Sequence, residues 1–387
     1  MELGCLLPGV SPEHLGVRIG VDSVDERSGV TVLIPPPGTT VGVDSRGGGP
    51  ATHETDIARP GTLPFGADAV VLTGGSALGL AAARGVQNRL AEAGIGTPVA
   101  GVRVPIVPAA AIFDIGRRPH HGSREDHRSG IPDAGDGYWA AVHALGYHLT
   151  EEPSISSFRG SEGAGTAAWT GRGFSRGGMG YASIRTSSGA WVSAVVIANP
   201  MGTILSLCGE LYAAQALSAY GLTLPGVDPA EVARLVATAA ERGTAQEDAR
   251  TNTTIAVICT DAGLTDSETT RLAASAHAGI ARAVWPSHTM FDGDTVFALS
   301  TGERTENSAA LLTELNIAAA DALSAAIIDG VLSAEEALPW ERDPDPFPDA
   351  FSTVFPELSQ KWEEEAERRL GNLENSPHPE PEHTDEQ

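Results

Sequence analysis

The sequence predicts a layered α/β sandwich, and three observations support this fold class. Short β-rich runs come early in the chain, two apolar runs of strand length lie in the middle, and stretches of helical periodicity lie before and after them. The middle runs, residues 191–198 and 254–259, have the composition of strands buried on both faces. No internal repeat is visible, so a repeat protein or coiled coil is not expected.

The individual elements follow from local patterns. Residues 17–21, 30–34 and 40–43 are β-rich and are separated by Gly and Pro turns, which predicts consecutive strands. Residues 69–73, then Gly74-Gly75-Ser76 and an alanine-rich stretch to Ala93, predict a strand, a tight turn and a helix. Further helices are predicted at 137–145, 230–242, 267–284 and 307–329.

The composition excludes several functional classes. The chain has 25 basic and 50 acidic residues, and its formal net charge of −25 disfavours nucleic acid, whose phosphates require clustered Lys and Arg. Its apolar runs are too short for a membrane span, and residues 1–5 lack the features of a secretory signal. We therefore expect no membrane partner and a cytoplasmic location. Lys361 is the only lysine, which excludes a Walker-A lysine and a cofactor Schiff base.

No metal or cofactor is predicted. The three cysteines are widely spaced and are interpreted as small apolar residues. The histidine-rich segment 120–127 matches no helical ligand spacing and lies among Gly, Pro and Arg, so it is predicted to be a solvated loop. Asp292 and Asp294 flank a glycine and could together bind Mg²⁺ or Ca²⁺, but two carboxylates without EF-hand spacing are a weak metal signature.

Three segments compete for the active site. Gly74-Gly75-Ser76 follows a strand, but the next glycine is one position too late for a nucleophile elbow. This turn is interpreted either as a helix N-terminus that helps to bind a carboxylate or an oxyanion, or as an ordinary tight turn. Thr253 opens a predicted strand after a polar loop, and Asp292-Gly293-Asp294 is either a tight turn or a site that orients an ammonium and a hydroxyl group.

Thr253 carries the more specific chemistry. If its own hydroxyl cuts the preceding peptide bond by an N-to-O acyl shift, Thr253 becomes a chain terminus that combines a nucleophile with an α-amino group. That amine, with a reference pKa of about 8, can act as the general base for the hydroxyl, so no histidine or lysine is required. The default alternative is a β-forming threonine at a loop-to-strand junction.

Five motifs in the same order resemble the self-processing L-aminopeptidase/D-esterase family, which includes β-aminopeptidases and nylon-oligomer hydrolases. The resemblance covers roughly residues 16–329. It implies a four-layer αββα sandwich, like that of the ornithine acetyltransferases, self-cleavage into two chains, and a tetramer or larger homo-oligomer. The motifs are Leu72-Thr73-Gly74-Gly75-Ser76-Ala77, Gly163-Ala164-Gly165-Thr166, Asn199-Pro200-Met201-Gly202, Asn252-Thr253-Thr254-Ile255 and Asp292-Gly293-Asp294-Thr295.

The resemblance assigns roles to particular residues. It implies cleavage between Asn252 and Thr253, giving chains 1–252 and 253–387, with Thr253 as the nucleophile. Asn199 matches an oxyanion-hole asparagine whose side-chain N–H groups face the developing negative charge. Asp292 and Asp294 match the acidic turn that orients the threonine and its amine. Gly74, Gly75 and Ser76 would line the same pocket.

Two positions depart from the family pattern. Arg172 stands, by spacing, where nylon-hydrolase-like members carry a lysine that contributes to the site. Arginine keeps the charge but cannot lose a proton, so an oxyanion or a substrate carboxylate remains its expected partner. Phe113 stands where the family often has tyrosine, so no phenol is expected there. Both changes bear on the substrate more than on the reaction class.

The C-terminal region differs in character from the rest. Residues 1–334 are predicted to form one hydrolase domain. Residues 335–387 hold 16 acidic and 4 basic residues and are predicted to be an acidic extension, with a short solvated helix at 363–369 and disorder from about 371.

The leading hypothesis is a cofactor-free, self-processing amidohydrolase that cleaves amide or ester bonds of small peptides through an acyl-Thr253 intermediate. One alternative is acyl transfer to an amine, as in the ornithine acetyltransferases. Another is a non-catalytic α/β binding protein in which Thr253 never becomes a chain terminus.

Overall fold

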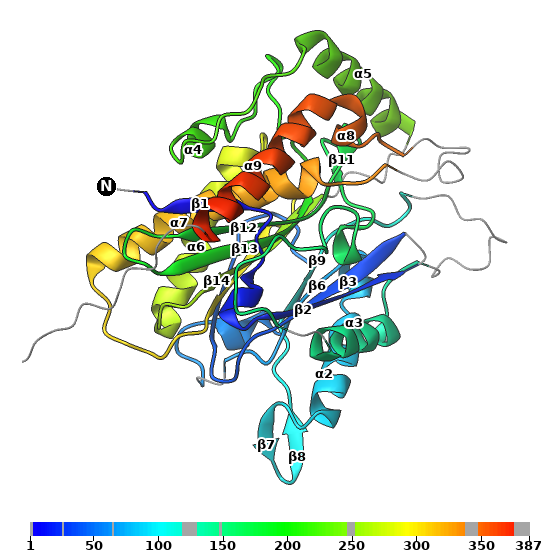
Figure 1. The fold of residues 1–387 in the computed structure, drawn as a ribbon. Helices are drawn as coiled ribbons and strands as arrows, with labels where there is room; N and C mark the ends of the chain where they lie inside the picture. Colours follow the sequence, from blue (N-terminus) through cyan, green and yellow to red (C-terminus); the bar gives the residue numbers. More distant parts are fainter. Residues whose placement is uncertain are drawn as a thin grey trace, which may run out of the picture.

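The computed structural model describes residues 3–24, 27–63, 66–117, 130–146, 149–245, 252–336 and 347–374. Two mixed β-sheets pack face to face, and helices cover the outer face of each sheet (Figure 1). The predicted four-layer αββα sandwich is therefore confirmed.

A six-stranded sheet contains the strand that begins at Thr253. Only β14 and β15 run parallel to each other, and the remaining neighbours in this sheet are antiparallel. The strand order is β1 (Cys5–Pro8), β12 (Gly178–Arg185), β13 (Trp191–Asn199), β14 (Thr253–Thr260), β15 (Thr295–Ser300) and β4 (Thr40–Ser45).

A five-stranded sheet forms the second inner layer. Its β6 and β9 strands are parallel, and its other neighbours are antiparallel. The order is β2 (Arg18–Val24), β3 (Ser28–Ile34), β6 (Val70–Thr73), β9 (Ala109–Ala111) and β5 (Thr52–His53).

The outer layers are helical. Helices α6 (Asp266–Ala283) and α7 (Ala309–Leu332) cover the six-stranded sheet, whereas α2 (Ala82–Glu92) and α3 (Ala134–Gly146) cover the five-stranded sheet. One apolar core lies between the two sheets, and a further core lies between each sheet and its helices, which is the layered burial that this fold requires.

Smaller elements connect these layers. The remaining helices and strands are α1 (Ser76–Gly79), β7 (Thr97–Val99), β8 (Val102–Val104), β10 (Trp169–Thr170), β11 (Ser175–Arg176), α4 (Ala214–Ser218), α5 (Pro229–Ala245), α8 (Phe351–Val354) and α9 (Pro356–Glu374), with 3₁₀ turns at Pro12–Leu15, Thr55–Ala58 and Gly163–Gly165. The β7–β8 hairpin projects from the body of the molecule (Figure 1).

Strand β12 was not predicted, because its glycines obscure the β pattern. Gly178 and Gly180 lie directly under α7, and a Cβ atom at Gly180 would be 2.1 Å from the carbonyl oxygen of Ala326. Glycine in this strand therefore permits close packing of helix on sheet. The three early strands were predicted, but β4 leaves β2 and β3 to join the other sheet.

Helix α7, which packs on β12 and β13, is strongly apolar. Among the described residues it is the one helix long and apolar enough to cross a membrane by composition, but 89% of its most apolar window is buried inside the protein. Burial on this scale is typical of the central helix of a layered core.

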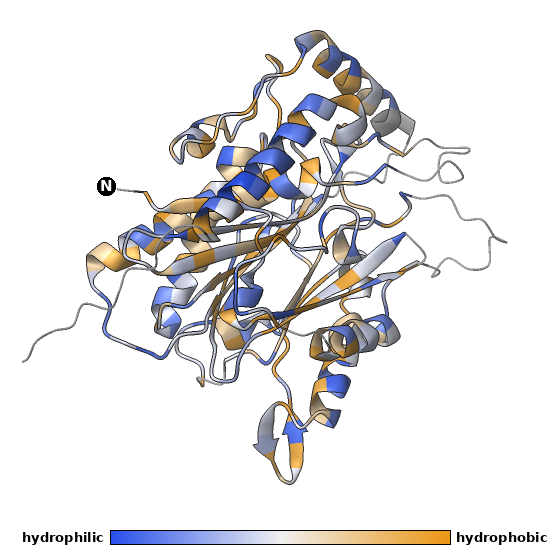
Figure 2. Ribbon diagram, in the orientation of Figure 1, coloured by the Kyte–Doolittle hydropathy of each residue, from blue (hydrophilic) through white to orange (hydrophobic). Residues whose placement is uncertain are grey.

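The C-terminal helix is longer than the sequence indicated. Helix α9 covers residues 356–374, so it includes the expected segment 363–369 and continues past residue 371, while residues 375–387 lie outside the described part of the chain. One face of α9 is not solvated, because Trp362 is fully buried and donates a 2.8 Å hydrogen bond to Asp329 of α7. Hydrophilic and hydrophobic residues accordingly alternate along α9 (Figure 2).

Buried polar contacts hold α9 in place. The Asp329 carboxylate also accepts hydrogen bonds from the backbone N–H of Tyr181 (2.9 Å) and from Arg159 (3.1 Å). Arg159 in turn forms an ion pair with Glu363 at 2.8 Å. A fully buried carboxylate thus links the extension to the domain, in addition to the apolar side chains of α8 and α9 that pack into the core.

Candidate active site

Thr253 is the first residue of β14, a strand that is buried along its whole length. Its partner across the antiparallel β13–β14 ladder is Asn199, the last residue of β13. On the other side, Asn252 forms a bridge with Asp292, which lies just before the parallel strand β15. Because the end of β13 and the starts of β14 and β15 meet at one side of the sheet, three separate sequence motifs converge there.

The Thr253 side chain faces the peptide bond that precedes it. Its hydroxyl donates a hydrogen bond to the carbonyl oxygen of Asn252 at 2.6 Å, and Thr253 is only 4% exposed. The same carbonyl oxygen accepts a hydrogen bond from the backbone N–H of Gly293 at 3.2 Å. A donor on this oxygen would stabilise negative charge as it develops there.

The space around Thr253 leaves no room for a side chain at position 293. A Cβ atom at Gly293 would lie 3.0 Å from the Thr253 hydroxyl oxygen and 3.2 Å from its methyl carbon. A side chain at this position would therefore press on Thr253 and, at 2.8 Å, on the Gly49 carbonyl oxygen.

Asp294 anchors the backbone next to the threonine. Its carboxylate accepts hydrogen bonds from the backbone N–H of Thr254 (2.7 Å) and from the Nδ1 atom of His288 (2.7 Å). Burial acts to lower the pKa of His288, but the hydrogen bond and negative charge of Asp294 outweigh it, so this pKa is raised. His288 was not among the predicted site residues, although it lies in the same sequence motif.

Asp292 supports the opposite side of the turn. It accepts hydrogen bonds from the backbone N–H groups of Met201 (3.2 Å) and Thr289 (2.7 Å), and it is 1% exposed. Burial, followed by the charge of Asp294, raises the pKa of Asp292. The two predicted carboxylates therefore position backbone around Thr253 from two sides.

A glycine-rich loop, residues 46–50, packs against this turn. The backbone N–H groups of Arg46 and Gly49 donate to the carbonyl oxygens of Asp294 and Asp292, both at 2.9 Å. A Cβ atom at Gly47 would lie 2.2 Å from the Asp292 carbonyl oxygen. The run of glycines allows this close backbone approach. Its position directly after β4 was the feature of the sequence that could have indicated a contact with the site.

Asn199 lies beside Thr253, but its side chain has a different partner from the one expected. Its Nδ2 atom donates to the carbonyl oxygen of Phe113 at 3.2 Å, and its Oδ1 atom accepts hydrogen bonds from the backbone N–H of Trp169 (3.0 Å) and from Arg117. The backbone N–H of Gly293, and not the Asn199 side chain, therefore donates to the Asn252 carbonyl oxygen, and Phe113 contributes a backbone carbonyl that accepts from Asn199.

Arg117 is the second residue that sequence reasoning missed. It is 7% exposed, donates to the Ala167 carbonyl oxygen at 3.1 Å, and lies over the Trp169 ring at 4.9 Å. Burial lowers its pKa to about 10, although the nearby charge of Asp114 acts in the opposite direction. No sequence motif marks this residue, because its role depends on contacts with distant segments.

Gly74, Gly75 and Ser76 form the predicted turn before α1, but its expected anion site is already occupied. The backbone N–H of Gly75 donates to the Asp114 carboxylate at 2.7 Å, and Ser28 donates to the same carboxylate at 2.7 Å. An external carboxylate or oxyanion would have to displace Asp114. The turn is linked to Asn199 indirectly, through the charge of Asp114 on Arg117 and through residues 112–113, whose carbonyl oxygens accept from Ser76 and from Asn199.

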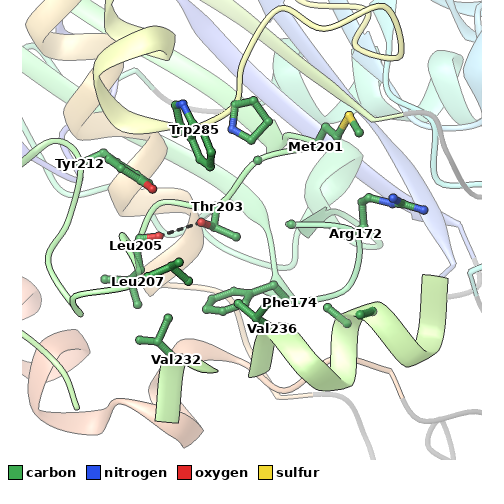
Figure 3. A pocket seen from close by; sticks show the side chains of 15 residues that line it. Arg172, Phe174, Met201, Thr203, Leu205, Leu207, Tyr212, Val232, Val236 and Trp285 are labelled. Atoms are coloured by element: carbon green, nitrogen blue, oxygen red, sulfur yellow. Dashed lines mark hydrogen bonds between the residues drawn. The ribbon is translucent and has the colours of Figure 1, made fainter. Parts of the chain in front are cut away.

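Arg172 lines an apolar pocket of about 750 Å³, which Met201 also lines. The aromatic side chains of Phe174, Tyr212 and Trp285 surround the pocket, and the Arg172 guanidinium points away from them at one edge (Figure 3). The lining includes Met201, whose backbone N–H binds Asp292, but it does not include Gly74, Gly75 or Ser76. The expectation that Arg172 and this turn line one pocket does not hold for this cavity.

Within the described residues, no group of three or more His, Cys, Asp or Glu side chains is placed to hold a metal ion. The histidine-rich segment 120–127 lies outside the described part of the chain.

The αββα layers of this chain are shared with a solved structure. An L-aminopeptidase/D-Ala-esterase/amidase from Ochrobactrum anthropi, described as a variant of the Ntn hydrolase fold, matches with a TM-score of 0.60 and 17% identity over 90% of this chain and 96% of that chain. Residues 13–340 match the model of peptidase family S58, and the chain belongs to this family.

Two relatives agree with this assignment. An uncharacterized aminopeptidase of Mycobacterium leprae is 37% identical over 342 residues, which cover 84% of this chain and 88% of that protein. A 6-aminohexanoate-oligomer endohydrolase of Agromyces sp. is 29% identical over 296 residues, which cover 74% of each chain. The predicted family and the predicted reaction class, a hydrolase of the self-processing aminopeptidase type, are confirmed.

Proposed function

We propose that Thr253 is the nucleophile of this peptidase, and that it becomes available when the chain cuts itself between Asn252 and Thr253. The observation that carries the proposal is the 2.6 Å contact between the Thr253 hydroxyl and the Asn252 carbonyl oxygen, with Gly293 donating to the same oxygen. The nucleophile and an oxyanion donor therefore already face one peptide bond in the intact chain.

Self-cleavage would proceed in two steps. The Thr253 Oγ1 atom attacks the Asn252 carbonyl carbon, and the resulting oxyanion is held by the Gly293 N–H. The C–N bond then breaks, the hydroxyl proton ends on the departing nitrogen, and an ester joins Asn252 to the Thr253 side chain. Water hydrolyses this ester, which leaves a carboxylate on Asn252 and a free α-amino group on Thr253.

The mature enzyme would reuse the same atoms. The Thr253 amine, with a reference pKa of about 8, takes the hydroxyl proton while Oγ1 attacks a substrate carbonyl. Asp292 and Asp294 favour the protonated amine by their charge, whereas the buried surroundings favour the neutral base. An acyl-Thr253 ester forms, the leaving amine accepts the proton, and water completes the hydrolysis.

The substrates are proposed to be small peptides or related amides with a free amino group. The names of the two relatives, an aminopeptidase and an oligomer endohydrolase, support this substrate class. The apolar pocket next to Met201 is large enough for an extended or aromatic group, and Arg172 at its edge could pair with a substrate carboxylate.

The chain is also proposed to form a homo-oligomer, with a tetramer as the expected size. The projecting β7–β8 hairpin carries three exposed valines, Val99, Val102 and Val104, which are 51%, 60% and 43% exposed. Exposed apolar side chains on a projecting hairpin are suited to burial against another copy. Light scattering after size-exclusion chromatography tests this, and a monomer at micromolar concentration would exclude it.

Intact-mass spectrometry with N-terminal sequencing tests the nucleophile. We expect two chains, the smaller starting at Thr253, and an intact, inactive chain for Thr253→Ala. Thr253→Ser is the matched control, because it keeps the hydroxyl and should still be cleaved. Cleavage elsewhere, or hydrolysis by an intact Thr253→Ala protein, would exclude the proposal.

A further inference from the structure

The Asn252 side chain is buried beside the bond that would be cut. Asn252 is 1% exposed, and its Nδ2 atom donates to the carbonyl oxygens of Asn199 and Pro200, both at 3.2 Å. Its Oδ1 atom is buried and has no hydrogen-bond partner among the described residues. The Asn252 side-chain N–H₂ group therefore has hydrogen-bond acceptors in this environment, whereas its side-chain oxygen has no donor among the described residues.

The Pro200 carbonyl group is held in place by contacts that do not involve Asn252, since its oxygen also accepts a hydrogen bond from the Gly171 N–H at 3.2 Å. The peptide unit that supplies the Pro200 carbonyl also supplies the Met201 N–H, which donates to the Asp292 carboxylate at 3.2 Å. A negative charge on the N–H side of a peptide unit polarises it and makes its carbonyl oxygen a better acceptor. The surroundings thus suit a group with only donors, such as an ammonium.

Asn252 would not remain there after cleavage. Its new carboxylate would lie among buried acids, since Asn252 pairs with Asp292 and its carbonyl contacts Gly293, which is flanked by Asp292 and Asp294. Like charges at short distance in a buried site repel strongly. The space that Asn252 leaves lies on the acyl side of Thr253, where the acyl group of a substrate must bind for the same nucleophile to attack it.

We propose that the space of the Asn252 side chain in the intact chain is the ammonium subsite of the mature enzyme, with the Asn199 and Pro200 carbonyl oxygens as acceptors. This inference rests on the proposed role of Thr253. It makes the intact chain a template for its own substrate, because the Asn252 acyl group and a substrate acyl group would occupy the same position.

The covalent structure of asparagine specifies the substrate class. Three carbons, Cα, Cβ and Cγ, separate the Asn252 carbonyl carbon from Nδ2, and a γ-aminobutyryl group has the same spacing between its carbonyl carbon and its ammonium. A β-alanyl group is one carbon shorter. An α-aminoacyl group instead places its ammonium at the Asn252 backbone nitrogen, where the acceptor is the Phe291 carbonyl oxygen at 3.1 Å.

A series of primary amides tests the spacing on the cleaved enzyme. The substrates are glycinamide, β-alaninamide, 4-aminobutanamide and butanamide, with the acid product measured by mass spectrometry and the Thr253→Ala protein as the blank. We expect 4-aminobutanamide to have the highest kcat/KM. Butanamide, which lacks only the ammonium, should be at least about tenfold poorer, since a charge-assisted hydrogen bond is lost.

Inhibition provides a second measurement. Propylammonium has the three carbons and the nitrogen of the proposed ligand, so it should compete with substrate, whereas the matched alcohol 1-propanol should inhibit at least about tenfold more weakly. Equal rates for butanamide and 4-aminobutanamide, a preference for glycinamide, or equal inhibition by the alcohol would each overturn the subsite.

Failure of the subsite is distinguishable from failure of the proposed function. An ester such as p-nitrophenyl butyrate reports the nucleophile without requiring an ammonium. If the cleaved enzyme hydrolyses this ester but shows no preference for an amine, the subsite is excluded and the role of Thr253 stands. If the Thr253→Ala protein hydrolyses the ester equally well, the role of Thr253 fails and the subsite fails with it.

Discussion

Arg117 donates a hydrogen bond to the side-chain oxygen of Asn199, and this contact determines which way the Asn199 carboxamide faces. The oxygen points toward the cation and the backbone N–H of Trp169, so the amide nitrogen points toward the opposite side, where the Phe113 carbonyl accepts it. A buried guanidinium therefore orients an asparagine whose neighbour across the strand ladder is Thr253.

Replacing Arg117 is expected to slow self-cleavage at the Asn252–Thr253 bond, because Arg117 orients Asn199, the neighbour of Thr253 across the strand ladder. Arg117→Gln removes the cation, so the amide of Asn199 loses its fixed orientation, and the rate of self-cleavage should fall by at least about tenfold because a charge-assisted hydrogen bond is lost. Cleavage is followed by mass spectrometry during expression and after purification. Arg117→Lys keeps a charge for Asp114 and should retain more activity. If the two variants have equal rates, Arg117 has only a structural role.

Gly293→Ala is expected to block the nucleophile without unfolding the protein. The new Cβ atom would lie 2.8 Å from the Gly49 carbonyl oxygen and 3.0 Å from the Thr253 hydroxyl oxygen, so the turn and Thr253 must shift apart and the alignment of the hydroxyl with the Asn252 carbonyl changes. We expect the variant to accumulate as intact chain, with a slowing of at least about tenfold because precise alignment is lost.

Gly49→Ala is the matched control for this change. The atoms nearest to its Cβ would be 3.9 Å away, although Gly49 contacts the same turn. It should be cleaved as the unchanged protein is. Normal cleavage of Gly293→Ala would show that the space beside Thr253 is not limiting.

Trp362→Ala is expected to destabilise the whole domain. Trp362 is fully buried and its indole N–H binds Asp329, so its removal leaves a cavity and a buried carboxylate with one partner fewer. We expect a loss of about 3–5 kcal/mol in the free energy of unfolding. Urea unfolding measures this in the uncleaved Thr253→Ala background, where the chain stays in one piece.

Trp139→Ala serves as the control, because Trp139 is 56% exposed on α3. It should change the unfolding free energy by less than about 1 kcal/mol. Equal losses for both tryptophans would mean that α9 does not contribute to the stability of the domain.

His288 is expected to make stability depend on pH in a specific direction. Its folded-state pKa is raised above the usual value by Asp294, so it contributes stability that is fully present below about pH 6.5, its unfolded-state pKa. This contribution is lost as the pH rises through the raised folded-state pKa. In the Thr253→Ala background, His288→Asn should lose this pH dependence, since asparagine can donate to Asp294 but does not titrate.

Urea unfolding at several pH values between 5 and 9 measures this effect. An unchanged pH profile in His288→Asn would show that the His288–Asp294 pair does not contribute to it. His143→Asn is the control. The His143 imidazole contacts the Val21 carbonyl oxygen, on the helix layer that covers the other sheet, and not Asp294.

Several features of the fold and the site were predictable because they depend on local patterns. The buried strand after Thr253 is a continuous apolar run, and α6 and α7 have helical periodicity, so their positions follow from the sequence. The motifs around Asn199, Thr253 and Asp292 were identified as parts of one site, and the structure brings these three residues to one sheet edge.

Other features were not predictable, because they depend on which distant segments meet. Strand β12 could not be predicted because it contains Gly178 and Gly180, which weaken the β pattern. These glycines are small because the backbone of α7 packs directly on them. The N-terminal turn at Gly75 has the pattern of an anion site, but only the fold shows that Asp114 already fills it. Arg117 has no motif, and its contact with Asn199 joins residues 82 positions apart.

The sequence by itself determined the layered class of the fold, the strand that Thr253 opens and the family of the protein, because hydrophobic periodicity and ordered motifs are local properties. The tertiary structure decided which groups surround the Asn252–Thr253 peptide bond: the Gly293 N–H contacts its carbonyl, Arg117 orients Asn199, and the Asn252 side chain occupies an acceptor-lined space. The reason is physical. Hydrogen-bond partners and desolvation are set by the atoms that packing brings within about 3 Å, and sequence spacing does not specify them.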